Sequence, residues 1–91
     1  MIKEFHAIVS GRVQMVMYRD FAQRKASSLS IVGTVRNLPD GTVEVIAAGE
    51  EEKLEKYIKK LHRGSLLAHV KQVEVEWREP SARYKGFKIV Y

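Results

Sequence analysis

The sequence predicts an α+β fold in which one antiparallel sheet carries two helices on a single face. Three observations lead to this fold. Apolar residues alternate in several short segments, they recur at helical spacing in two longer ones, and the segments follow one another as β-α-β-β-α-β with an extra C-terminal strand. The natural arrangement of that order is the ferredoxin-like split β-α-β sandwich. We therefore expect a single domain over residues 1–91.

The first half of the chain is predicted to form a strand, a helix and a hairpin. The apolar positions of the first strand are Phe5, Ala7 and Val9, which alternate with polar residues. From Tyr18 the apolar residues follow helical spacing instead, as far as the serines before residue 31. Ile31–Asn37 and Thr42–Ala48 then read as two strands, joined by the turn sequence Leu-Pro-Asp-Gly at 38–41.

The second half is predicted to form a helix and two strands. Acidic residues from Glu50 precede an apolar stripe, and basic residues followed by Gly64 end it, as in a helix. The next strand has three alternating apolar residues, Val73, Val75 and Trp77. We expect Trp77 to lie in the core. The last short strand, 86–91, carries Phe87, Ile89 and Tyr91 in alternation.

The overall charge gives little indication of a partner. The net charge is +5, but acidic residues are interleaved with the basic ones almost throughout, which is typical of a solvated surface. Only the local positive charge around Arg12 and Arg19 suggests an anionic ligand.

Several classes of site and location are not expected. The chain has no cysteine, and His6, His62 and His69 lack the spacing of metal ligands, so we expect no disulfide, metal or cofactor. Lys3 and Glu4 interrupt the apolar run at the N-terminus, unlike a signal peptide. No segment is long enough to span a membrane. We expect a cytoplasmic monomer.

Residues 11–19, with the sequence GRVQMVMYR, are the most informative stretch of the chain. A glycine-led turn before a helix can direct several backbone N–H groups at one point, next to the positive end of the helix dipole. Arg19 adds a planar, permanently charged group that suits a phosphoryl or carboxylate group. We expect Val13 and Val16 to be core residues and Gln14 to brace the loop.

The predicted topology places Asn37 beside this loop. If the first strand runs up, the first helix runs down and the second strand runs up again, so Arg19 and Asn37 meet at one edge of the sheet. An asparagine side chain both donates and accepts hydrogen bonds, and can therefore position a water molecule. Such a site suits an acyl phosphate, because its carboxylate leaving group departs without help from an acid.

These residues resemble the acylphosphatase family. Its members carry a G-x-V-Q-G-V-x-[FY]-R loop and a G-x-V-x-N strand, which match GRVQMVMYR and GTVRN here. The resemblance extends to an A-x-V element at 68–70 and a closing F-x-I at 87–89. It covers nearly the whole chain and implies a ferredoxin-like fold.

The resemblance also implies a set of site residues. Arg19 would bind the substrate phosphate together with the loop amides, and Asn37 would orient the attacking water. The phosphate-binding loop would comprise Gly11, Arg12, Val13, Gln14, Met15, Val16, Met17 and Tyr18. The substrate would be a small acyl phosphate, hydrolysed to a carboxylate and inorganic phosphate without metal or cofactor. We expect neither nucleic acid nor a membrane as a partner.

Met15 is the main departure from the family pattern, which has glycine at this position. If the position requires a positive φ, a methionine there costs about 1–2 kcal/mol. One alternative is therefore a catalytically impaired domain that binds anions or a protein. An RNA-binding module is a weaker alternative, since Thr42–Ala48 lacks the aromatic residues on which bases stack.

Overall fold

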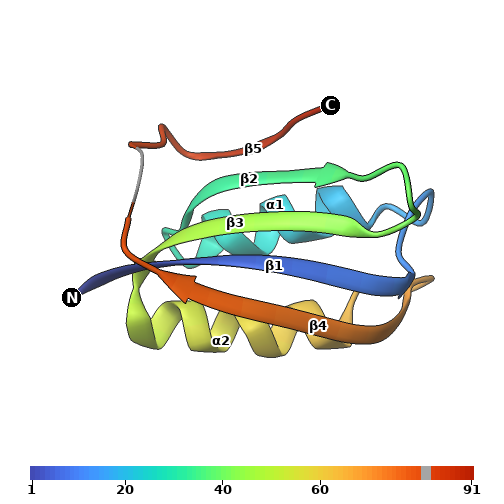
Figure 1. Cartoon of the computed structure of the whole chain (residues 1–91), viewed down its shortest axis with the longest axis horizontal. Coiled ribbons are helices and arrows are strands. Elements are labelled where there is room, and N and C mark those ends of the chain that lie inside the picture. Colours follow the sequence, from blue (N-terminus) through green and yellow to red (C-terminus); the bar gives the residue numbers. More distant parts are fainter. Residues whose placement is uncertain (81–82) are drawn as a thin grey trace.

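The structure is a computed structural model that describes residues 1–80 and 83–91. One sheet forms the front layer in Figure 1, and the two helices lie behind it on a single face. In chain order the elements are β1 (Ile2–Arg12), α1 (Tyr18–Ser28), β2 (Val32–Asn37), β3 (Val43–Glu50), α2 (Glu51–Arg63), β4 (His69–Arg78) and β5 (Phe87–Ile89). The predicted order of elements and the ferredoxin-like fold are confirmed.

The sheet is mixed, which differs from the expected antiparallel sheet. Its strand order is β4-β1-β3-β2-β5, and β1 to β4 pair antiparallel, but β5 runs parallel to β2. The pairing of Glu4 with Arg78 shows that β4 ends at the same end of the sheet at which β2 begins. The chain therefore enters β5 beside Gly33, from the same end as β2, and runs in the same direction.

The core lies between the sheet and the helices. Phe5, Ala7 and Val9 are fully buried on this face, as expected. Trp77 was expected in the core, but 43% of it is exposed. It does share the face with Phe5, and the two rings meet edge to face with centroids 5.6 Å apart. Because β4 is an edge strand, no further strand among the described residues covers the outer side of the indole.

Two buried tyrosines fix the helices relative to each other. The Tyr18 hydroxyl donates a hydrogen bond to the carbonyl oxygen of Leu61 at 2.8 Å, and that of Tyr57 donates to Ala22 at 2.8 Å. Burial raises the pKa of both phenols, so each stays protonated and remains a donor at neutral pH. The Tyr18 bond joins the start of α1 to the last turn of α2.

A bulge ends the regular part of β1 just before the loop. The register with β4 shifts between Ser10 and Gly11. Gly11 has a φ of 118°, and a Cβ atom there would collide with the backbone carbonyl oxygen of His69. Only glycine fits this position, so Gly11 sets the direction in which the loop leaves the sheet.

The face of the sheet without helices carries a network around Glu44. One oxygen of its carboxylate lies 2.9 Å from His6 Nε2, and the other accepts a hydrogen bond from Arg36 Nε at 2.8 Å. Burial alone would raise the pKa of Glu44, but the hydrogen bonds from His6 and Arg36 together outweigh it and lower the pKa below its usual 4.5.

This network predicts a loss of stability in acid. Since the pKa of Glu44 is lower in the folded state, its contribution is fully present above the unfolded pKa and is lost as the pH falls through the folded value. The Glu44→Gln variant should lose about 1 kcal/mol at pH 7 and show a smaller decline below pH 4.5 than the parent protein. Urea unfolding at several pH values measures both effects, and parallel declines would contradict the role assigned to Glu44.

Candidate active site

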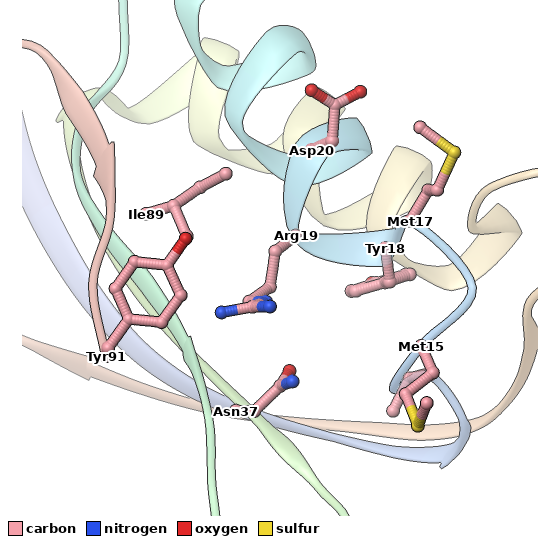
Figure 2. A pocket seen from close by; sticks show the side chains of 9 residues that line it. Met15, Met17, Tyr18, Arg19, Asp20, Asn37, Ile89 and Tyr91 are labelled. Atoms are coloured by element: carbon pink, nitrogen blue, oxygen red, sulfur yellow. The ribbon is translucent and has the colours of Figure 1, made fainter.

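A pocket of ≈ 150 Å³ opens where the loop after β1 meets the start of α1, the end of β2 and the segment that includes β5. Figure 2 shows the side chains of Arg19 and Asn37 directed toward the same space, with Tyr91 beside them. The residues that line it are Val13, Met15, Met17, Tyr18, Arg19, Asp20, Asn37, Ile89 and Tyr91. The topology thus brings Arg19 and Asn37 together as the sequence predicted.

The loop is held in place by two buried valines and by one glutamine that bonds to the next hairpin. Val13 and Val16 are buried, as expected, and anchor it in the core. The Gln14 amide donates hydrogen bonds to the carbonyl oxygens of Leu38 and Thr42, both at 2.8 Å. Gln14 therefore braces the loop against the β2–β3 hairpin, and this expectation is confirmed.

The loop backbone leaves its donors free. Met15 and Met17 have left-handed conformations, with φ of 60° and 62°. Within the described part of the chain, no backbone N–H of residues 13–17 donates a hydrogen bond. Met17 is the N-cap of α1 and provides no side-chain cap. The unpaired N–H groups and the positive end of the α1 dipole together favour an anion at this point.

Arg19 also keeps its donors available. Its Cζ atom lies 5.0 Å from the centroid of the Tyr91 ring, a cation–π contact that uses no N–H group. The adjacent carboxylate of Asp20 is engaged by Arg24 Nε at 2.8 Å. Among the residues that the structure describes, none forms a hydrogen bond or an ion pair with the Arg19 guanidinium. All N–H groups of its guanidinium are therefore available to a ligand.

Asn37 has an unused acceptor. Its Oδ1 atom is buried and has no hydrogen-bond partner among the described residues. Leaving a buried amide oxygen unsatisfied costs about 1–3 kcal/mol. A donor that entered the pocket, such as the O–H of water, would remove this cost.

Sequence reasoning assigned some loop residues that do not line the pocket and missed others that do. Gly11, Arg12, Gln14 and Val16 lie outside the lining, and Arg12 is exposed at the end of β1. Ile89 and Tyr91 line the pocket but were expected only as strand residues. The parallel pairing of Val35 with Ile89 brings this segment to Asn37. The alternation of apolar residues from Phe87 was the available signal, but it does not specify the direction or the neighbour of the strand.

Residues 1–80 and 83–91 contain no group of three acidic, histidine or cysteine side chains placed to hold a metal ion. Neither helix in this part of the chain has the length and apolar character needed to span a bilayer.

The fold and the pocket define a class of protein: a ferredoxin-like sandwich with unpaired backbone N–H groups in the loop, an arginine with available donors and a buried amide at one end of the sheet. The sequence model of the acylphosphatase family matches residues 5–89. The chain belongs to the acylphosphatase family, which confirms the resemblance found in its sequence.

Individual relatives agree along almost the whole chain. An acylphosphatase of Thermus thermophilus is 52% identical over 83 residues, which cover 91% of this chain and 93% of the relative. One of Thermococcus kodakarensis is 47% identical over 85 residues, covering 93% and 92%. The crystal structure of acylphosphatase from Bacillus subtilis is 34% identical and superimposes with a TM-score of 0.95, covering 100% of both chains.

Proposed function

We propose that this protein is an acylphosphatase, which hydrolyses acyl phosphates to a carboxylate and inorganic phosphate. The observation that carries the proposal is that Arg19 and Asn37 line the same pocket at the start of α1. Each of them has unused hydrogen-bonding groups. The membership of the chain in the acylphosphatase family supports the same chemistry.

The loop and Arg19 would hold the phosphoryl group. The residues assigned to the loop are Gly11 to Tyr18, and the free N–H groups of 13–17 would donate to the phosphoryl oxygens. Gly11 would set the direction of the loop and Val13 would anchor it in the core, while the side chains of Gln14 and Val16 lie outside the pocket lining and would hold the loop in shape. The Arg19 guanidinium would donate to two oxygens at once and balance their charge as the transition state forms.

Asn37 would position the attacking water. Its Oδ1 would accept a hydrogen bond from one O–H group of the water, which orients the water oxygen toward phosphorus. As the new oxygen–phosphorus bond forms, the bond from phosphorus to the acyl oxygen breaks, and its electron pair leaves on the carboxylate. The remaining water proton passes to a phosphate oxygen or to solvent. This leaving group is stable as an anion, so the step requires neither a general acid nor a cofactor.

Assembly and location are part of the same proposal. We infer that residues 1–91 act as one monomeric domain in the cytoplasm and bind no nucleic acid. The absence of cysteine fits a reducing compartment. The basic residues are interleaved with acidic ones, and β3 has no aromatic residue on which a base could stack, so an RNA-binding surface is not expected.

The test of the proposed activity is the release of phosphate from acetyl phosphate, compared with that from p-nitrophenyl phosphate. The described residues that line the pocket include no histidine or lysine to protonate an alcohol or phenol leaving group, so we expect only acetyl phosphate to turn over well above its uncatalysed background. The Arg19→Ala variant provides the reference for a disabled site. Turnover equal in the two proteins, or absent from both, would exclude the enzyme and leave the anion-binding domain.

Met15 offers a separate prediction. Its φ of 60° is positive, so a methionine at this position is strained. The residue is 98% exposed at the pocket mouth. Met15→Gly removes the steric cost of about 1–2 kcal/mol. We expect tighter phosphate binding or a higher rate, by a few-fold, in inhibition and steady-state assays. If neither changes, the loop already has its active geometry and the steric argument is wrong.

A further inference from the structure

A second hollow adjoins the phosphate pocket on the outer side of α1. It has a volume of ≈ 200 Å³ and lies between the loop after β1, α1 and the segment that follows α2. Its lining consists of Val16, Met17, Arg24, Ser65, Leu66 and Leu67. Met17 lines both hollows, so the two are neighbours across this one residue.

The walls of this second hollow are apolar and exposed. Leu66 is 98% exposed, Leu67 70% and Met17 72%. Most of the large apolar side chains that are exposed in the described part of the chain border one of the two hollows. Apolar side chains grouped in this way on a small protein are typical of a binding surface.

The groove is held in a fixed position relative to the phosphate loop. The Ser65 hydroxyl donates a hydrogen bond to the Val16 carbonyl oxygen at 2.9 Å, which ties the segment after α2 to the loop. Arg24 contributes its apolar stem, while its guanidinium is paired with Asp20. The backbone next to Leu66 and Leu67 is thus tied to the loop at Ser65.

The geometry of phosphoryl transfer points the acyl group toward this groove. The attacking and leaving oxygens lie roughly in line through phosphorus. A water held by Asn37 therefore requires the acyl oxygen on the far side of the phosphoryl group. In Figure 2 Asn37 lies on one side of Arg19, whereas Met17 lies on the other and its side chain points out of the pocket. A chain attached to the acyl oxygen would pass over Met17.

We propose that the groove formed by Met17, Leu66 and Leu67 is a subsite for the acyl chain of the substrate, which makes acyl phosphates with an extended apolar acyl group the preferred substrate class. This rests on the proposed function of the neighbouring pocket. A protein partner would need a larger surface than this hollow provides, whereas a short hydrocarbon chain suits its volume, its apolar walls and its position next to the phosphoryl group.

The experiment compares kcat/KM for acetyl, hexanoyl and octanoyl phosphate, all below the concentration at which they aggregate. Each methylene fully removed from water favours binding about fourfold, and an open groove covers only part of the chain, so octanoyl phosphate should exceed acetyl phosphate by at least about tenfold. The gain should come from a lower KM, because the groove binds substrate and transition state alike.

In the double variant Leu66→Ser/Leu67→Ser the ratio of kcat/KM for octanoyl phosphate to that for acetyl phosphate should fall to about one to three. Ile2→Ser changes an exposed apolar residue outside both hollows and should keep the ratio.

A binding measurement separates this proposal from the catalytic one. Calorimetry with octylphosphonate and methylphosphonate needs no turnover, and the longer ligand should bind at least about tenfold more tightly, with the gain lost in the double variant. If no acyl phosphate is hydrolysed but this difference holds, the enzyme proposal fails and the groove stands. Equal affinities for the two phosphonates, a flat chain-length profile, or a profile that the double variant leaves intact would each overturn the groove.

Discussion

The Arg19→Ala variant is expected to lose about 100- to 1,000-fold in kcat/KM for acetyl phosphate, the effect typical of removing one charge-stabilising group from an active site. The physical reason is the availability of its donors: the Tyr91 ring supports the guanidinium, and Arg24 engages the neighbouring carboxylate of Asp20. Nothing else on the described pocket wall carries a full positive charge. Phosphate inhibition of the variant should weaken in parallel, because the ground state carries a similar negative charge.

Two further variants sharpen this result. Arg19→Lys keeps the charge but loses the planar fork, so it should recover only a small part of the lost rate. Arg63→Ala makes the same change at an exposed position at the end of α2, outside the pocket, and should retain full activity. Circular dichroism confirms that each variant is folded. If Arg63→Ala and Arg19→Ala lose activity equally, the effect is one of net charge and Arg19 has no special role.

The Asn37→Ala variant should lose about 100-fold or more in kcat with little change in KM. Asn37 would contact the water, and its loss would affect the transition state more than substrate binding. Because Oδ1 is buried without a partner, the same variant should also be more stable than the parent protein, by about 1 kcal/mol. Lower activity with higher stability in urea unfolding is a combination that general damage to the fold cannot produce.

Asn37→Asp tests which property of the side chain matters. The substitution keeps the shape and an acceptor oxygen, but it places a negative charge beside the phosphoryl group. It should therefore raise KM as well as lower kcat, unlike Asn37→Ala. Full activity in Asn37→Ala would show that water needs no positioning by this residue and would remove Asn37 from the proposed mechanism.

The sequence was sufficient for the parts of the fold that depend on local periodicity. Alternation around Phe5 and helical spacing from Tyr18 predicted β1 and α1, because each pattern places its apolar residues on one face. The meeting of Arg19 with Asn37 followed from the alternating directions of three consecutive elements. Gln14 was expected to brace the loop, although its partners in the hairpin were not specified.

What the sequence did not predict depends on neighbours that are distant along the chain. Trp77 has the pattern of a core residue, but the exposure of its ring depends on β4 being an edge strand. The parallel direction of β5 depends on where β4 ends, and the contact between Tyr91 and Arg19 follows from that direction. The network around Glu44 joins three residues on three adjacent strands, β1, β3 and β2, and no periodicity identifies such a group.

The docking of β5 against β2 also bears on how the protein acquires its activity. This strand has three residues, pairs on one side only, and brings in Ile89 and Tyr91, while the loop they face follows the first strand of the chain. The pocket is thus closed by residues about 70 positions along the chain from the loop, and a chain with both helices formed still lacks a complete pocket until this segment has paired with β2. Short edge strands are among the first elements to open locally in a native protein. Catalytic competence should therefore be among the first properties lost when the molecule begins to open locally.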